Sequence, residues 1–282
     1  MVDIKFHCDE NRLFYKGFLV RAFTYTDYSI DMHSHDFYEV NIVLAGSGTH
    51  HIENGTFTVS PGDVFVIPPM VAHAYTETAG LEVYHILLQK RFVDQNKAET
   101  QKVEGFLQLT EIEPFLRSNF TNAFFLHLGQ TELLHLRKEL EFIDDNGDFT
   151  WEESAPLKYH TTWKILYWFS FLLKKQMNAD MALAKKKYES QIIKALEHIH
   201  KNFGEKITIE DLCKIAFLSR STFLRSFNSV CGVSPIEYLN SYRCKKAIEL
   251  LSSLDFSKTE AAHSCGFYDL SHMERMLKKY NK

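Results

Sequence analysis

The chain lacks the features that mark exported and membrane proteins. No stretch of uncharged apolar residues reaches the roughly 18 needed for a membrane-spanning helix. The N-terminal MVDIKFHCDE does not have the basic-then-apolar order of a signal peptide. The 5 cysteines form no CxxC pair, so we interpret them as reduced thiols of the core. These absences predict a cytoplasmic protein with no membrane partner.

The chain also lacks a large net charge, but its charges are unevenly distributed. Residues 1–182 hold 15 Lys and Arg against 25 Asp and Glu, which gives −10, and residues 183–282 hold 17 against 11, which gives +6. Only the C-terminal third therefore has the positive balance that a polyanion-binding domain needs. The length of 282 residues predicts two domains, each long enough to bury its own core.

The segment 208–239 predicts two helices joined by a tight turn. Apolar residues recur at helical spacing in the first helix, and Thr208 followed by Asp211 is typical of an N-cap with an acidic first turn. Ser219 is suited to cap the second helix, in which Phe223 faces inward. This is the helix-turn-helix pattern, whose second helix enters the major groove of DNA. An ordinary two-helix hairpin has the same spacing.

A second unit of the same kind favours DNA binding over the simple hairpin. Pro235 suits the first turn of a long helix predicted to run through Leu251, and Ser257 then begins the second unit. Aligning Arg225 with Arg275 gives an offset of 50 residues. Two units joined by a rigid helix are expected to place their recognition helices about one DNA turn, roughly 34 Å, apart.

The N-terminal part, from about residue 14 to residue 90, contains short β-rich runs separated by glycine turns. The predicted strands are Phe37–Leu44, Thr49–Ile52, Thr56–Val59, Val64–Ile67 and Leu81–Leu88. Asn54-Gly55 is a strong signal for a type I′ hairpin. Several short strands without helices between them predict a β-barrel or a sandwich.

Regularly spaced polar residues lie within these strands. They follow the pattern HxHxxxE, a glycine, PGDxxxxPP and a histidine, at His33, His35, Glu39, Gly46, Pro61 and His73. This spacing resembles the motifs of the cupin barrel. Asp27 and Met70 stand where cupin metalloenzymes usually carry glycine.

Two interpretations of these polar residues remain open. In metal-binding cupins the residues matching His33, His35, Glu39 and His73 hold one divalent ion such as Mn, Fe, Ni or Zn. In the other interpretation they line a small-molecule pocket without metal, as in sensory cupins fused to DNA-binding domains. We favour the second interpretation, so no cofactor is required.

The expected effector-binding residues are His33, His35, Tyr38, Glu39, His73 and Tyr75. Strand alternation does not tell whether His50 and His85 also face inward.

After residue 91 the periodicity becomes helical. A helix from about Thr131, with Leu136 and Leu140 on one face, and a second from about Pro156 to Met177 form a predicted bridge over residues 131–178. This bridge either caps the barrel or also supplies a dimer contact. Residues 179–188 are the predicted linker between a sensor domain, 1–178, and a DNA-binding domain, 189–282. The predicted fold class is α+β, with a cupin-like barrel and an all-α tandem helix-turn-helix domain.

Residues 189–280 resemble the DNA-binding domain of the AraC/XylS family of transcription regulators. The resemblance is carried by LSRSTFLRSF from Leu218, GVSPIEYL from Gly232 and CGFYDLS from Cys265, and the cupin-like half is similar to the effector domain of the family. It implies DNA-facing positions in both units, at Arg220, Ser221, Thr222, Leu224, Arg225, Leu270, Ser271, Glu274, Arg275 and Lys278. Arg225 and Arg275 are the leading candidates for base contacts, because arginine can donate two hydrogen bonds to guanine. Glu274 departs from this chemistry, since a carboxylate must accept from cytosine or repel phosphate.

The sequence therefore predicts an effector-responsive regulator rather than an enzyme. Its expected partners are double-stranded DNA, an unidentified small molecule, a second copy of the chain and, if it is an activator, RNA polymerase. One alternative is a cupin metalloenzyme, a dioxygenase or isomerase, with a vestigial DNA-binding tail. Another is a constitutive DNA-binding protein whose barrel only dimerises. The sequence names neither the effector nor the sign of regulation.

Overall fold

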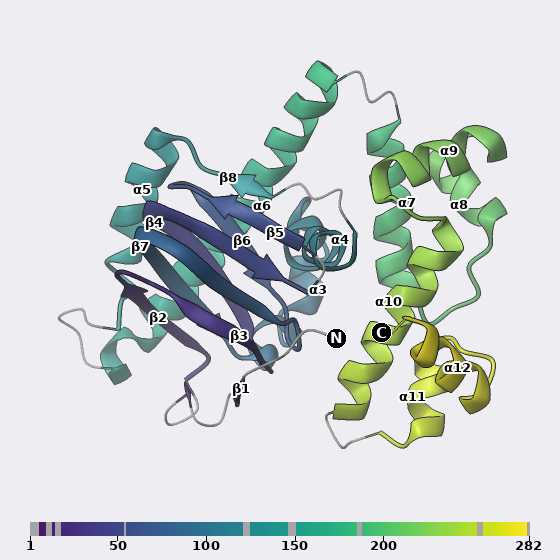
Figure 1. Ribbon diagram of the computed structural model, residues 1–282, viewed down its shortest axis with the longest axis horizontal. Coiled ribbons are helices and arrows are strands. Elements are labelled where there is room, and N and C mark those ends of the chain that lie inside the picture. Colours follow the sequence, from purple (N-terminus) through teal and green to yellow (C-terminus); the bar gives the residue numbers. More distant parts are fainter. Residues whose placement is uncertain are drawn as a thin grey trace. The chain divides into compact units, whose positions relative to one another are not determined.

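The computed structural model of the protein describes residues 6–9, 13–14, 18–53, 55–120, 125–145, 151–184, 188–252 and 256–280 (Figure 1). The chain forms two compact units. The sheet unit comprises residues 2–119 and 123–177, and the helical unit comprises residues 178–282 with residue 1 and residues 120–122. The predicted order of a β-rich part followed by a helical part is confirmed.

Among the described residues, the sheet unit has eight strands in one sheet. They are β1 (Phe6–Cys8), β2 (Val20–Tyr25), β3 (Ile30–His35), β4 (Tyr38–Ile52), β5 (Gly55–Val59), β6 (Asp63–Ile67), β7 (His73–Leu88) and β8 (Leu126–His127). β4 and β7 are antiparallel and pair from Tyr38 opposite Leu88 to Ile52 opposite His73. β2 and β3 pair with β7, and β5 and β6 pair with β4. The two long strands are therefore the central ribbon of the unit.

A bulged region bends this ribbon near its middle. The register of the β4–β7 ladder shifts between Val43 and Thr49. Here Gly46 has a φ of 74° and Gly80 a φ of 56°. A Cβ atom on Gly46 would lie 2.1 Å from the carbonyl oxygen of Gly80, so only glycine permits this close approach. The bulges bend the strands and let the two halves of each strand pair with different neighbours.

The structure corrects one part of the fold prediction, because the sheet is not closed into a barrel. The main path of paired strands runs β1-β3-β7-β4-β6-β8, and no pairing among the described residues joins β8 back to β1. β1 has 3 residues and β8 has 2, which is too short a ladder to close a barrel. β4 also unites two strands that the sequence predicts separately. Asn54 of the predicted hairpin turn lies outside the described residues.

The sheet unit contains helices that the sequence analysis did not predict. After β7 come α2 (Lys90–Asp94), α3 (Lys97–Thr100), the π-helix η2 (Gln108–Ile112) and α4 (Glu113–Asn119). The segment formed by η2 and α4 packs against β6. Each of these helices is at most 7 residues long and stays in place through packing rather than through its own propensity.

The predicted bridge is formed by α5 (Gln130–Leu140) and α6 (Trp151–Ala184). Leu136 and Leu140 are buried within the sheet unit, so the apolar face of α5 belongs to the core. Leu134 and Phe171 instead lie outward, with 60% and 63% of their surface exposed. The segment expected as a linker begins inside α6. Among the described helices, none combines the length and the apolarity that a membrane span requires.

The helical unit contains α7 (Glu189–Asn202), α8 (Ile209–Ala216), α9 (Arg220–Cys231), α10 (Pro235–Ser252), α11 (Lys258–Ser264) and α12 (Leu270–Tyr280). The predicted caps at Thr208 and Ser219 are confirmed, and Ser257 forms a further cap that the sequence analysis did not predict. Thr208 and Ser257 each form a reciprocal capping box, with Asp211 and Glu260 respectively, and the Ser219 side chain caps α9. Each cap satisfies backbone N–H groups that the first turn of a helix leaves unpaired.

The long helix α10 joins the two helix-turn-helix units. It packs against α9 of the first unit and against α11 and α12 of the second. Arg243 of α10 donates hydrogen bonds to the carbonyl oxygens of Phe203 (2.7 Å) and Glu205 (2.6 Å), just beyond α7. These bonds fix α10 against the end of α7. Both helix-turn-helix units therefore pack on the same fixed helix, α10.

Candidate effector site and DNA-binding helices

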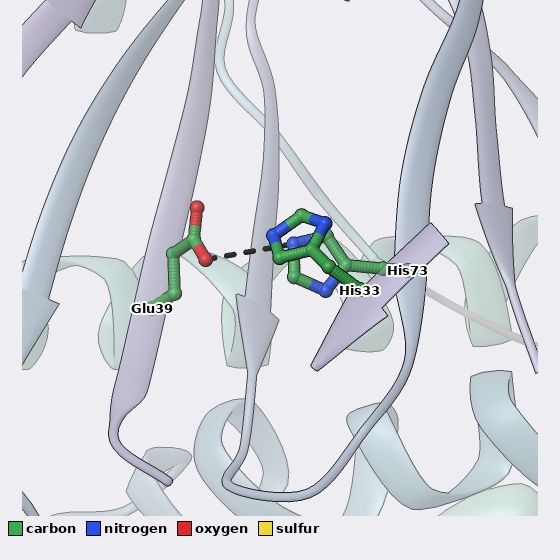
Figure 2. A group of neighbouring side chains, drawn as sticks. All are labelled: His33, Glu39 and His73. Carbon is green, nitrogen blue, oxygen red and sulfur yellow. Dashed lines mark ion pairs between the residues drawn. The ribbon is translucent and has the colours of Figure 1, made fainter. Parts of the chain in front are cut away.

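Three of the predicted site residues converge inside the sheet unit. The ligand atoms of His33, Glu39 and His73 all lie within 4.8 Å of one another, and all three side chains are buried. Figure 2 shows the two imidazoles side by side, across from the Glu39 carboxylate. They come from β3, β4 and β7, which the ladder places next to one another. We call this group, together with His35 and His85, the Glu39 cluster.

Glu39 is the centre of the cluster. Its Oε2 lies 3.0 Å from Nε2 of His35 and 3.5 Å from Nε2 of His73, while its Oε1 lies 2.7 Å from Nδ1 of His85. The His85 contact is a well-aligned hydrogen bond. The Nε2 atoms of His35 and His73 are close to the carboxylate but lack hydrogen-bond alignment, and within the described residues they have no other partner.

The opposite ring nitrogens explain this arrangement. Nδ1 of His33, His35 and His73 lies near the backbone carbonyl oxygens of Asp31 (3.0 Å), Phe37 (2.7 Å) and Val71 (3.5 Å). A carbonyl oxygen only accepts, so Nδ1 carries the proton and a neutral ring keeps its lone pair on Nε2. The Nε2 atoms of His35 and His73 are therefore the ring atoms left to face the Glu39 carboxylate.

Burial sets the charge state of the cluster. Burial acts to raise the pKa of the Glu39 carboxyl, but contacts with His35, His73 and His85 outweigh it and hold that pKa well below its ordinary value. Burial lowers the pKa of His73, and burial together with the neighbouring His73 lowers the pKa of His33 to about 4. At neutral pH the cluster thus contains an ionised carboxylate beside neutral rings at His33 and His73.

A divalent metal ion fits the Glu39 cluster. Two imidazoles and a carboxylate are a donor set of first-row divalent ions, and the buried Nε2 of His73 has no hydrogen-bond partner among the described residues. The Nδ1 contacts with carbonyl groups are of the kind that orients histidine ligands of a metal. His33, Glu39 and His73 would hold the ion. His35, the fourth predicted ligand, approaches Glu39 but is not a member of this converging trio.

The remaining predicted effector residues divide between the interior and the edge of the site. Tyr75 is fully buried, stacks on His50 with ring centroids 4.4 Å apart and accepts a hydrogen bond from Asn41. Tyr38 donates instead to Glu111 Oε1 in η2, at 3.1 Å. Tyr75 therefore lines the interior beside the Glu39 cluster, and Tyr38 ties η2 to the sheet.

In the first helix-turn-helix unit, Arg220, Ser221 and Arg225 are exposed on α9, whose inner face is the buried pair Phe223 and Phe227. Arg220 forms an ion pair with Glu210 of α8.

The partly buried positions of α9 have other partners or surroundings. Thr222 is half-buried and belongs to the cap, since its Oγ1 accepts from the Ser219 hydroxyl at 2.9 Å. Leu224 is half-buried. The Ser221 hydroxyl lies 3.4 Å from the hydroxyl of the N-cap Ser219. Arg225 is thus the side chain of the predicted α9 set that points to solvent without an ion pair or cap bond among the described residues.

In the second unit, Ser271, Glu274, Arg275 and Lys278 are exposed on α12. Glu274 Oε1 lies 3.8 Å from Lys258 Nζ of α11, so part of its charge is offset within the unit. Leu270 is half-buried and packs against the core formed around Met273. The repeat offset correctly places Met273 where Phe223 lies in the first unit, because both are buried inner-face residues.

Comparisons with known proteins agree with this two-part structure. The model of the AraC-like ligand binding domain matches residues 15–131, and the model of a helix-turn-helix domain matches residues 212–282. The chain is similar to the HTH-type transcriptional activator RhaS of Citrobacter koseri, with 24% identity over 249 residues, 88% of this chain and 83% of that protein. The chain belongs to the AraC/XylS family of transcription regulators. RhaS of Klebsiella pneumoniae is 26% identical over the same length.

Two solved structures have partial similarity to the chain. Unsaturated fatty acid-bound ToxT from Vibrio cholerae has 14% identity and a TM-score of 0.40, over 93% of this chain and 90% of that chain. The DNA-binding domain of AdpA, in complex with a target DNA, has 28% identity and a TM-score of 0.30, over 31% of this chain and 79% of that chain.

As an AraC/XylS regulator, the chain combines an effector-binding domain with a DNA-binding domain, and it is an effector-responsive transcription regulator. The sequence analysis left open whether His50 and His85 face inward, and the structure shows both buried in the effector domain. His85 lies opposite Asn41 in the β4–β7 ladder, two residues along β4 from Glu39 and on the same face. The pairing of Phe37–Leu44 with Leu81–Leu88 was the signal that would have found it.

Proposed function

We propose that this chain activates transcription when a small-molecule effector binds at the Glu39 cluster, and that it acts as a homodimer that contacts RNA polymerase. Activation is supported by the relatives, which are named transcriptional activators. The chain acts by binding rather than by turnover, and it works in the cytoplasm beside its DNA. The outward Leu134 and Phe171 are available for a contact between copies.

The observation that carries this proposal is the construction of α9. Its inner face is buried, its first turn is capped, and Ser221 and Arg225 extend from the opposite face. A fixed helix with an exposed arginine is suited to donate hydrogen bonds to guanine in the major groove. The net charge of +6 over residues 183–282 adds attraction to the phosphate backbone.

Effector control follows from the buried polarity of the sensor. Buried nitrogen atoms that have no partner within the described part of the chain destabilise the domain relative to a state in which a ligand satisfies them. An effector that makes these contacts in one arrangement of the domain shifts the population toward that arrangement. Its identity is set by the atoms that complete the Glu39 cluster.

The proposal is tested by binding the full chain to a fragment of its own upstream region and to a scrambled fragment of equal length, measured by fluorescence anisotropy. We expect the native fragment to bind about a thousandfold more tightly, the low end for specific recognition. Equal affinity for both fragments would contradict sequence-specific regulation. Transcription from the native fragment in a purified system then checks the sign of regulation.

A second candidate is that the sensed species is a divalent metal ion. The converging ligand atoms of His33, Glu39 and His73 favour it. Bound there, the ion would act as a structural and sensory charge, and the chain's own residues would orient it through the Nδ1 contacts of their rings.

Native mass spectrometry of protein purified without added metal, then titrated with Zn²⁺ or Mn²⁺, tests this candidate. A stoichiometric mass increase that is lost in His73→Gln and kept in His135→Gln, an exposed histidine of α5, would support it. Metal uptake that is equal in the two variants would rule out the Glu39 cluster as the metal site.

A further inference from the structure

A buried arginine with unused donors lies beside the Glu39 cluster. Arg117 of α4 is fully enclosed, with 1% of its surface exposed. Its Nε donates to Glu113 Oε1 at 2.7 Å, and its Nη2 donates to Glu113 Oε2 at 3.3 Å and to the carbonyl oxygen of Val66 at 2.6 Å. Its Nη1 has no partner among the described residues. An arginine has five N–H donors, and the two on Nη1 have no acceptor among the described residues.

Other unpartnered polar atoms are linked to this position through the ring of Phe65. The Arg117 guanidinium lies 5.2 Å from the ring of Phe65, and that ring lies 4.8 Å from the ring of His50. Both ring nitrogens of His50 and Oδ1 of Asn41 are buried without partners among the described residues. Burial and the nearby charge of Arg117 lower the pKa of His50 well below its ordinary value, so His50 is neutral and offers one donor and one acceptor.

These groups differ from the Glu39 cluster in chemistry but adjoin it. The rings of His50 and His73 are 6.1 Å apart. The Glu39 cluster presents an anion and lone pairs, whereas this group presents a cation and neutral donors and acceptors. Arg117 lies in α4, the helix that directly follows the π-helix η2, and such irregular turns are frequent at functional sites. Buried polar atoms form hydrogen bonds in nearly all folded proteins, so a group of unpartnered polar atoms indicates that a bound molecule pairs with them.

We propose that Arg117, His50 and Asn41 form an acid-recognition subsite of the effector site, and that the effector is a small organic acid. Its carboxylate accepts from Nη1 of Arg117, a charge-assisted bond stronger than one to a neutral oxygen. A neighbouring hydroxyl of the acid is met by Oδ1 of Asn41 and by His50. The inference rests on the proposed sensing function and adds the chemical class of the effector.

Glu113 does not remove the need for this partner. It contacts the Nε and Nη2 side of the guanidinium and leaves Nη1 untouched. Burial raises the pKa of the Glu113 carboxyl even with Arg117 beside it, so Glu113 offsets the arginine less completely than an exposed carboxylate would. Water is the competing occupant of Nη1, and it carries no charge to match the guanidinium.

The test uses acetate as the simplest carboxylate and acetamide as its neutral counterpart of equal size. The thermal unfolding midpoint of the full chain is measured against the concentration of each probe, at constant ionic strength with sodium chloride. We expect acetate to stabilise the wild-type chain with about tenfold higher affinity than acetamide, the difference between a charge-assisted and a neutral hydrogen bond. Equal effects of the two probes would overturn the proposal.

Three variants assign the effect to the subsite. Glu113→Gln combined with Arg117→Met removes both charges of the pair together, because removing Arg117 alone would leave a buried unpaired carboxylate. His50→Phe keeps the stacked ring and removes only its nitrogen atoms, and it serves if the double variant fails to fold. Arg137→Met, at an exposed arginine of α5, is the control. The preference for acetate should disappear in the double variant, weaken in His50→Phe and persist in Arg137→Met.

Persistence of the acetate preference in the double variant would also overturn the subsite. Binding to the upstream DNA fragment separates this outcome from failure of the regulator itself. Specific DNA binding without an acetate preference would remove only the organic-acid assignment, whereas loss of specific DNA binding in the wild-type chain would contradict the proposed function.

Discussion

Arg117 and Arg225 show how burial assigns opposite roles to the same side chain. Arg117 is enclosed, and its bonds fix α4 onto β6. Arg225 is exposed on a capped helix and has no ion pair among the described residues. A buried guanidinium is suited to one small partner, and an exposed one is suited to the edge of a base or a phosphate.

Replacing Arg225 with alanine should reduce sequence preference more than overall affinity for DNA. A lost guanine contact costs about 1–3 kcal/mol of discrimination between native and scrambled fragments. Lys278→Ala is the matched control. We expect this exposed lysine near the end of α12 to contact phosphate, so its loss should weaken binding of both fragments alike. Anisotropy titrations with the two fragments provide the measurement. If Arg225→Ala weakens both fragments equally, Arg225 is a phosphate contact.

His50 should make the chain less stable in mild acid. Burial and Arg117 depress its pKa in the folded state, so below about pH 6.5 the unfolded chain binds a proton that the folded chain refuses. His50 therefore does not reduce the free energy of unfolding above that pH. Below it, this residue alone lowers the free energy of unfolding by up to about 1.4 kcal/mol per pH unit. Urea unfolding at a series of pH values should show a shallower slope for His50→Phe. An unchanged slope would mean that His50 takes up a proton in the folded chain.

Local spacing was enough to predict His33, Glu39 and His73, but it did not predict their neighbours. The three lie in one sequence motif, and the structure pairs β7 with both β3 and β4. Whether His50 faces inward depends on the register shifts at the middle of β4, which no pattern of alternation reveals. Arg117 was missed because its helix is short and is held by the sheet rather than by its own sequence.

At the scale of elements, α5 was predicted from its apolar periodicity, helices with side-chain caps were predicted with their starting residues, and the short helices α2 and α3 were missed. Thr208, Ser219 and Ser257 mark their helix starts to the residue, because a side-chain oxygen there satisfies free N–H groups. No side chain caps α2 or α3 in this way. Barrel closure was also beyond local patterns, since it depends on the lengths of the two end strands.

Helix α5 offers a direct comparison of a core position with a surface position. Leu136→Asp should lower the free energy of unfolding by about 4 kcal/mol, because it buries an unpaired charge. Leu134→Asp, two residues away and 60% exposed, should change it little. Urea unfolding measures both. Light scattering of Leu134→Asp then tests the dimer contact, and an unchanged dimer mass would exclude this face of α5.

At the scale of the whole molecule, the two parts of the chain carry opposite charge. Residues 1–182 have a net charge of −10 and residues 183–282 have +6. Like charge repels the phosphate backbone, so the first part disfavours DNA and the second attracts it. The charge distribution thus orients the chain during encounter even though its total of −4 suggests no affinity for a polyanion.

DNA affinity should therefore fall steeply with salt, and the slope should report the basic residues one by one. Each neutralised phosphate contributes about −0.9 to the slope of log affinity against log salt. Lys278→Ala should make the slope shallower by about that amount. Lys138→Ala, at an exposed lysine of α5, should leave the slope unchanged. A flat salt dependence of the wild-type chain would contradict backbone binding altogether.

The close crossing of Gly46 and Gly80 also determines which mutations the gene tolerates. Any side chain at Gly46 collides with the backbone of Gly80, whereas a Cβ at Gly80 meets nothing within 4 Å and costs only the strain of its positive φ. In a library of all single substitutions, position 46 should therefore be depleted of every residue except glycine. Position 80 should still accept asparagine and aspartate, which tolerate the left-handed backbone. Two glycines in contact with each other thus face unequal selection.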